Sequence, residues 1–114
     1  MKDSRLIREN EKTLVAFLLK KLELKLEEYP IGENVIEYED GKMGSITFGN
    51  GDSAAYAGDL IQAHYTDTDN VPVVITLTID NENKLLDLDF WKEDFSKLLR
   101  YPETDDLKFS ELYS

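Results

Sequence analysis

Two carboxylates and the only tryptophan of the chain lie close together near residue 90, and their spacing suggests binding chemistry. Asp87 and Asp89 are two positions apart, so on a strand they would point the same way, roughly 6.6 Å from each other. Like charges this close raise each other's pKa unless solvent or a partner offsets them. The pair is therefore either a solvated outer face or a docking surface for Lys or Arg of a partner. Trp91 would anchor such an interface, or would pack locally on the segment that follows.

The residue types needed for nucleophilic catalysis are scarce. His64 is the only histidine, and no nucleophile or orienting carboxylate can be assigned to it from the sequence. The chain has no cysteine, which excludes disulfides, zinc–thiolate sites and thiol catalysis. We interpret His64 as a partly exposed strand residue and predict no catalytic residue, so we do not expect an enzyme.

Two short acidic motifs could in principle hold a metal ion. Glu82-Asn83-Lys84 has the E-x-K spacing of metal-dependent nucleases, with Asp67 or Asp69 upstream as a possible ligand. This motif falls in a predicted turn, however, and nothing else basic is available there to hold a phosphate. The run 67–70 resembles a calcium loop but lacks its glycine and its bidentate glutamate. We predict no metal and no cofactor, and keep a metal-dependent hydrolase as an alternative.

The element that must position Asp87, Asp89 and Trp91 is a predicted β-hairpin. Apolar residues alternate along its first strand, at Val73, Ile75, Leu77 and Ile79. A polar turn follows at 80–83. The return strand has one predicted core face and one outer face. The core face carries Leu86, Leu88 and Phe90, and the outer face carries Leu85, Asp87, Asp89 and Trp91.

One amphipathic helix is expected within the stretch from Asp3 to Glu28. Its apolar stripe repeats at helical spacing and includes Leu14, Val15, Leu18, Leu19, Leu22 and Leu26. Asn10 is the expected N-cap, with Ser4 as an earlier alternative. Pro30 disfavours helical backbone at the residue before it and should end the helix.

The remaining segments predict short strands joined by tight turns. Strands are expected at 34–40, 43–48 and 54–65, the last of them bent at Gly58, with turns at 40–42, 49–52 and 67–70. One or two helical turns are expected at 93–99, and a polar tail at 103–114. Tight turns require antiparallel neighbours. We therefore predict a single α+β domain, residues 1–114, with an antiparallel sheet of four to five strands and one long N-terminal helix packed on one face.

Charge is the strongest global feature. The net charge is −11, and residues 31–114 hold six Lys or Arg against eighteen Asp or Glu, whereas residues 1–30 hold seven against six. Such a field repels nucleic acid and anionic lipid and attracts basic proteins, although solubility alone could also explain it. The sequence has no transmembrane run and no signal peptide, so a cytoplasmic protein is expected.

Three motifs carry a resemblance to known proteins. The run 40–45 reads D-G-K-M-G-S, the run 86–95 reads L-D-L-D-F-W-K-E-D-F, and an Arg5-Leu6 pair precedes the helix. With these motifs the chain resembles a family of small bacterial domains of unknown function. Its size and acidity are also similar to those of immunity proteins from bacterial toxin systems, including contact-dependent growth inhibition.

The second resemblance implies a function. Immunity proteins bind and block a cognate toxin, often a basic nuclease, by occluding its active site. It implies a basic protein toxin as partner, no nucleic acid, no membrane, and a toxin-binding surface drawn from the acidic residues and the tryptophan. The candidate residues are Asp67, Asp69, Asp87, Asp89, Trp91, Glu93 and Asp94. A housekeeping adaptor or structural domain is a further alternative.

Overall fold

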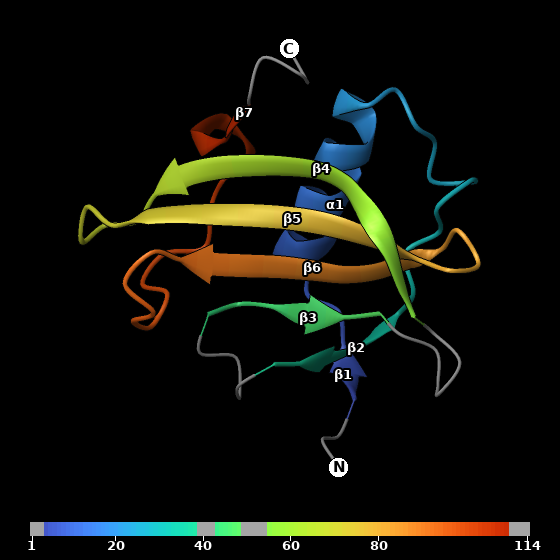
Figure 1. Ribbon diagram of the computed structural model, residues 1–114, viewed down its shortest axis with the longest axis horizontal. Coiled ribbons are helices and arrows are strands. Elements are labelled where there is room, and N and C mark those ends of the chain that lie inside the picture. The colour runs from blue at the N-terminus through green and yellow to red at the C-terminus, as the bar shows by residue number, and fades with distance from the viewer. Residues whose placement is uncertain (1–3, 39–42, 49–54, 110–114) are drawn as a thin grey trace.

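A computed structural model describes residues 4–38, 43–48 and 55–109 of the chain (Figure 1). The predicted turns at 40–42 and 49–52, the expected strand start at residue 54 and the last five residues of the tail lie outside the described residues. In the described part, no helix is long and apolar enough to cross a membrane.

The fold is α+β, with one α-helix and an antiparallel sheet, as predicted, but the sheet has seven strands instead of four to five. The strands run in the order β1-β2-β3-β6-β5-β4-β7. The elements are β1 (Arg5–Leu6), α1 (Glu9–Lys21), β2 (Asn34–Glu37), β3 (Ile46–Thr47), β4 (Tyr56–Thr66), β5 (Pro72–Asp80), β6 (Leu85–Lys92), the 3-10 helix η2 (Thr104–Asp106) and β7 (Lys108–Phe109).

The centre of the sheet is formed by β4, β5 and β6, whose period-2 patterns separate a buried face from an open face. The helix lies behind these strands in Figure 1 and covers only the buried face. That face joins Leu14, Val15, Leu18 and Leu19 of α1 to Ile61, Ala63, Tyr65, Val73, Ile75, Leu77, Leu88 and Phe90 in one hydrophobic cluster. Near Gly58, where a bend is expected, the pairing of β4 with β5 has two register shifts, one between Tyr56 and Gly58 and one between Asp59 and Ile61.

Two strands that the sequence analysis did not predict are β1 and β7, each only two residues long. β1 pairs with β2, and β7 pairs with the edge of β4 at Ala63 and His64. A two-residue strand has no room for a period-2 pattern, which is why neither strand could be predicted from the sequence.

The helix is shorter than predicted and begins at a different residue. Its N-cap is Arg8, and the Glu11 carboxylate accepts a hydrogen bond from the Arg8 N–H at 2.7 Å, so neither Asn10 nor Ser4 caps it. The helix ends at Lys21, because Glu23 has a φ of 61° and reverses the chain. The Leu24 N–H then donates to the Leu19 carbonyl, as in a Schellman motif, which usually has glycine at the reversing position.

A β-bulge divides the return strand. Leu77 is aligned with Leu88 but Ile79 with Leu85, so two residues of β6 lie opposite Thr78. The alternation therefore shifts by one position: Leu85 belongs to the core cluster, whereas Leu86 is buried outside it. The prediction that Leu86 is on the core face and Leu85 on the outer face is wrong for this reason. Leu88 is fully buried, as predicted.

Candidate functional site

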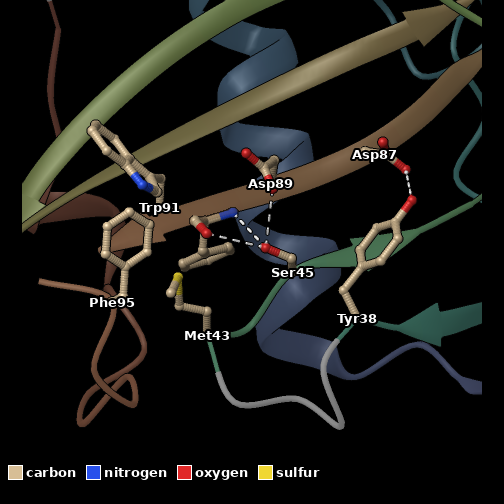
Figure 2. Close-up of a pocket in the computed structure, with 8 residues that line it drawn as sticks. Tyr38, Met43, Ser45, Asp87, Asp89, Trp91 and Phe95 are labelled. Carbon is tan, nitrogen blue, oxygen red and sulfur yellow. Dashed lines mark hydrogen bonds between the residues drawn. The ribbon is translucent and has the colours of Figure 1, made fainter. Parts of the chain in front are cut away.

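A pocket of about 320 Å³ opens on the sheet face that the helix leaves uncovered (Figure 2). Its lining residues come from β6, from the ends of β2 and β3, and from the turn after β6. They are Tyr38, Met43, Ser45, Asp87, Asp89, Phe90, Trp91 and Phe95. Figure 2 shows Trp91 and Phe95 at one end, Tyr38 at the other, and Asp89 with Ser45 between them. The pocket combines aromatic walls with two carboxylates.

The aromatic end of the pocket is unusually open to solvent. Trp91 is 48% exposed and Phe95 is 60% exposed, and their rings meet edge to face with centroids 6.0 Å apart. Phe95 has a φ of 62°, a backbone conformation that is costly for a bulky side chain. Two large exposed aromatic rings in contact are characteristic of binding surfaces, where such residues supply much of the affinity.

The two carboxylates are held by hydroxyl donors from neighbouring strands. The Tyr38 hydroxyl donates to Asp87 Oδ1 at 3.0 Å, and Ser45 Oγ lies 3.2 Å from Asp89 Oδ1. Ser45 Oγ also accepts the N–H of Phe90 at 2.8 Å, which fixes its position against β6. Asp87 and Asp89 thus face the same pocket, as the two-residue spacing predicts.

The surroundings of Asp89 disfavour ionisation of its carboxyl group. Partial burial raises its pKa above the usual value; the Ser45 hydrogen bond offsets part of this rise, and the charges of Asp87 and Asp59 add to it. The phenol of Tyr38 also has a raised pKa, chiefly through burial, so it stays protonated and donates to Asp87. An entering cation would relieve the electrostatic cost at Asp89.

Gly44 allows β3 to pass close to β6 at the base of the pocket. Its φ is 92°, which favours glycine, and a Cβ added there would lie 3.2 Å from the Leu98 side chain and 3.5 Å from the Phe90 ring. This close approach brings Met43 and Ser45, on either side of Gly44, into the pocket lining.

The predicted site residues Asp67 and Asp69 belong to a different structure, the ion cluster around Lys92. Lys92 has no solvent exposure, and its Nζ lies 2.9 Å from Asp67 Oδ2, 2.6 Å from Asp69 Oδ2 and 2.9 Å from the Lys97 carbonyl oxygen. The Asp67 side chain is also completely buried. Asp67 is therefore placed inside the molecule and cannot touch a partner directly, and Asp69 is about one-third exposed beside it.

The ion cluster also explains why 93–99 is not helical. The N–H groups of Leu99 and Arg100 donate to the two oxygens of Asp67, at 2.8 and 3.0 Å, and the Lys97 carbonyl accepts from Lys92. These backbone groups are thus bonded to side chains instead of to one another, so the predicted helical turns are absent.

The other two predicted binding residues lie at the turn after β6. Glu93 and Asp94 are both exposed, and Asp94 accepts hydrogen bonds from the N–H and hydroxyl of Ser96. Neither lines the pocket, but Asp94 directly precedes Phe95, which does, and Glu93 lies one position earlier. They extend the acidic surface beyond the aromatic end of the pocket.

His64 and the E-x-K motif lie where the sequence predicts them, on a strand and in a turn. His64 is exposed on β4, aligned with Val74. Glu82 and Lys84 lie in the turn between β5 and β6, where their N–H groups donate to Asp80. Among the described residues, no group of three His, Asp or Glu side chains is arranged to share a metal ion.

Sequence reasoning missed five pocket residues and the buried lysine; one of the five, Phe90, was assigned to the core face, where it is buried, but it also lines the pocket. Tyr38, Met43, Ser45 and Phe95 reach the pocket from segments whose alignment with β6 depends on the tertiary fold. Lys92 did carry a signal, because it shares the inward parity of Leu88 and Phe90. A lysine at a core position of a strand predicts a buried acidic partner, and Asp67 is that partner.

Comparison with known proteins gives a family but no described relative. No curated protein and no solved structure matches the chain. A family described as "Domain of unknown function (DUF6984)" matches residues 4–102, which include the helix, the pocket residues and the ion cluster around Lys92. The chain therefore belongs to the DUF6984 family of domains of unknown function.

Proposed function

We propose that this chain is a non-catalytic binding protein of the immunity type, which neutralises a basic toxin by covering the toxin's active site. One observation carries the proposal: acidic and exposed aromatic side chains meet on the sheet face opposite the helix. Aromatic residues supply most of the affinity of protein interfaces. Carboxylates at the same place favour a cationic partner and speed its association.

A toxin that acts on nucleic acid suits this surface well. The active site of such a toxin must attract phosphate groups and is therefore basic. The acidic face of this chain would compete with the substrate for the same charges. The proposed partner is accordingly a basic protein whose substrate site this face covers. Binding of this kind requires neither a cofactor nor a metal.

The hydrolase alternative is not the function that we propose. Its E-x-K residues Glu82 and Lys84 lie in an exposed turn organised by Asp80, away from the pocket residues. No observation on the described residues favours it.

The test is protection in cells. Proteins encoded beside genes of this family are each expressed in cells, and those that prove toxic are expressed again with this chain while growth is measured. We expect growth to be restored for one cognate toxin and the purified pair to form a complex. The variant Asp87→Asn with Asp89→Asn should protect less than a charge-matched control, Glu27→Gln with Glu82→Gln, whose residues do not line the pocket. Absence of protection against every such toxin would refute the proposal.

A further inference from the structure

The pocket is suited to a single cationic side chain. Its volume of about 320 Å³ is at the lower end of ligand-binding cavities, which suits one side chain better than an extended ligand. Two of its eight described lining residues are acidic and none is Lys, Arg or His. Its occupant should therefore be positively charged and partly apolar.

The arrangement of walls and carboxylates favours arginine over lysine. A guanidinium is planar, stacks on aromatic faces and can donate to two carboxylate oxygens at once. Here the exposed rings of Trp91 and Phe95 stand at one end of the pocket and Asp89 lies beside them (Figure 2). Met43 offers an apolar wall for the methylene stem of the incoming side chain. An ammonium group is compact and strongly hydrated, so it would use the aromatic rings less well.

We propose that this pocket holds one arginine side chain of the basic partner, with the guanidinium between Trp91 and the carboxylates of Asp87 and Asp89. This inference rests on the proposed function, because it names the group that the binding face recognises. The guanidinium pairs with the Asp89 carboxylate beside the aromatic rings, and Asp87, which accepts from Tyr38 at the other end of the pocket, adds to the negative field around it. A protein with an arginine in its active site would lose access to substrate when that arginine is held in this way.

The single tryptophan makes the test direct, because its fluorescence reports on the pocket itself. The chain is titrated with three capped tripeptides, Gly-Arg-Gly, Gly-Lys-Gly and Gly-citrulline-Gly. Citrulline matches arginine in shape but is uncharged. We expect the arginine peptide to shift the Trp91 emission saturably, the lysine peptide to bind more weakly, and the citrulline peptide to bind at least about tenfold more weakly, because hydrogen bonds to charged groups are stronger.

A matched pair of variants separates the pocket from the overall charge. Asp89→Asn and Glu82→Gln each remove one negative charge, but only Asp89 lines the pocket. Asp89→Asn should weaken the arginine peptide about tenfold or more, and Glu82→Gln should leave its affinity nearly unchanged. Thermal melting of both variants checks that they are folded.

Three outcomes overturn the inference. The first is no saturable change in Trp91 emission up to about 10 mM arginine peptide, which is tenfold above a Kd of about 1 mM. The others are equal affinity for the arginine and citrulline peptides, and an equal loss of arginine-peptide affinity in the two variants. Failure here with intact protection in cells would refute the arginine site and leave the proposed function standing. Arginine binding without protection in cells would refute the proposed function and leave the arginine site standing.

Discussion

The ammonium group of Lys92 lies 2.9 Å from the Asp67 carboxylate, and neither side chain is exposed to solvent. Lys92 ends β6, one residue after Trp91, and Asp67 follows the last residue of β4. The pair therefore connects the end of β6 to the turn before β5. Through Leu99 and Arg100 it also holds the segment that carries Phe95.

Replacing Asp67 should lower the free energy of unfolding more than replacing Lys92. Asp67→Ala leaves the Leu99 and Arg100 N–H groups without their acceptor and removes one of the three acceptors of a buried ammonium, so we expect a loss of about 3–5 kcal/mol in the free energy of unfolding. Lys92→Met should cost less, because Asp67 still accepts from the N–H groups of Thr68, Leu99 and Arg100. Urea unfolding of both variants measures this order, and a larger loss for Lys92→Met would contradict it.

Acid should destabilise the protein through carboxylates that are ionised and paired when folded. Burial would raise the pKa of Asp67 and of Glu11, but their hydrogen bonds outweigh it, so both values lie below the usual range. A lowered folded-state pKa adds stability above the unfolded value of about 4, and this stability is lost as the pH falls through the folded value.

We therefore expect the free energy of unfolding to fall steadily as the pH drops below about 5. Glu11→Gln should weaken this dependence, because it removes the carboxylate that accepts from Arg5 and from the Arg8 N–H. Urea unfolding at a series of pH values tests this, and an unchanged acid slope in the variant would assign the effect to other groups.

The bulge in β6 predicts unequal costs for two neighbouring leucines. Leu88→Ala should lower the free energy of unfolding by about 2–5 kcal/mol, because Leu88 is fully buried in the core cluster. Leu86→Ala should cost clearly less, because Leu86 lies outside that cluster. Chemical denaturation measures both, and equal losses would mean that the bulge does not turn Leu86 away from the core.

Much of this fold follows from patterns that the sequence displays locally. The alternation is regular over 61–66 of β4 and 72–77 of β5, so the buried faces could be assigned correctly there. Beyond Leu77 it fails, since Thr78 and Asp80 are buried and Ile79 is only partly buried. The end of α1 could not be found, since its reversing residue is Glu23 instead of a glycine. The bulge was also hidden, because Leu85 and Leu86 are both apolar and either could face the core.

Removing the pocket charges should leave the fold intact or make it more stable. Above its raised folded-state pKa, the ionisation of Asp89 costs stability, and Asp87→Asn with Asp89→Asn removes this cost while it nearly preserves shape. We expect an unchanged or higher Tm at pH 7, and a smaller dependence of Tm on salt. A clear fall in Tm would show that these carboxylates stabilise the folded chain.

The candidate site was only half visible in the sequence. Asp87, Asp89 and Trp91 stand on one strand at two-residue spacing, so their common face could be inferred. Ser45 and Tyr38 join them only because β6 pairs with β3 and β3 with β2. The hydrogen bonds that result, from Ser45 to Asp89 and from Tyr38 to Asp87, join residues 44 and 49 positions apart.

Beyond its bulge, the side chains of β6 divide into an inner and an outer set, and Phe90 of the inner set also lines the pocket. Leu88, Phe90 and Lys92 point into the molecule, and Asp87, Asp89 and Trp91 line or flank the open pocket. If the pocket binds the proposed partner, mutation of the outer set would alter recognition without creating a cavity in the core. Descendants of one ancestral chain could therefore acquire different partners within a few substitutions, while the inner set continues to specify the same architecture.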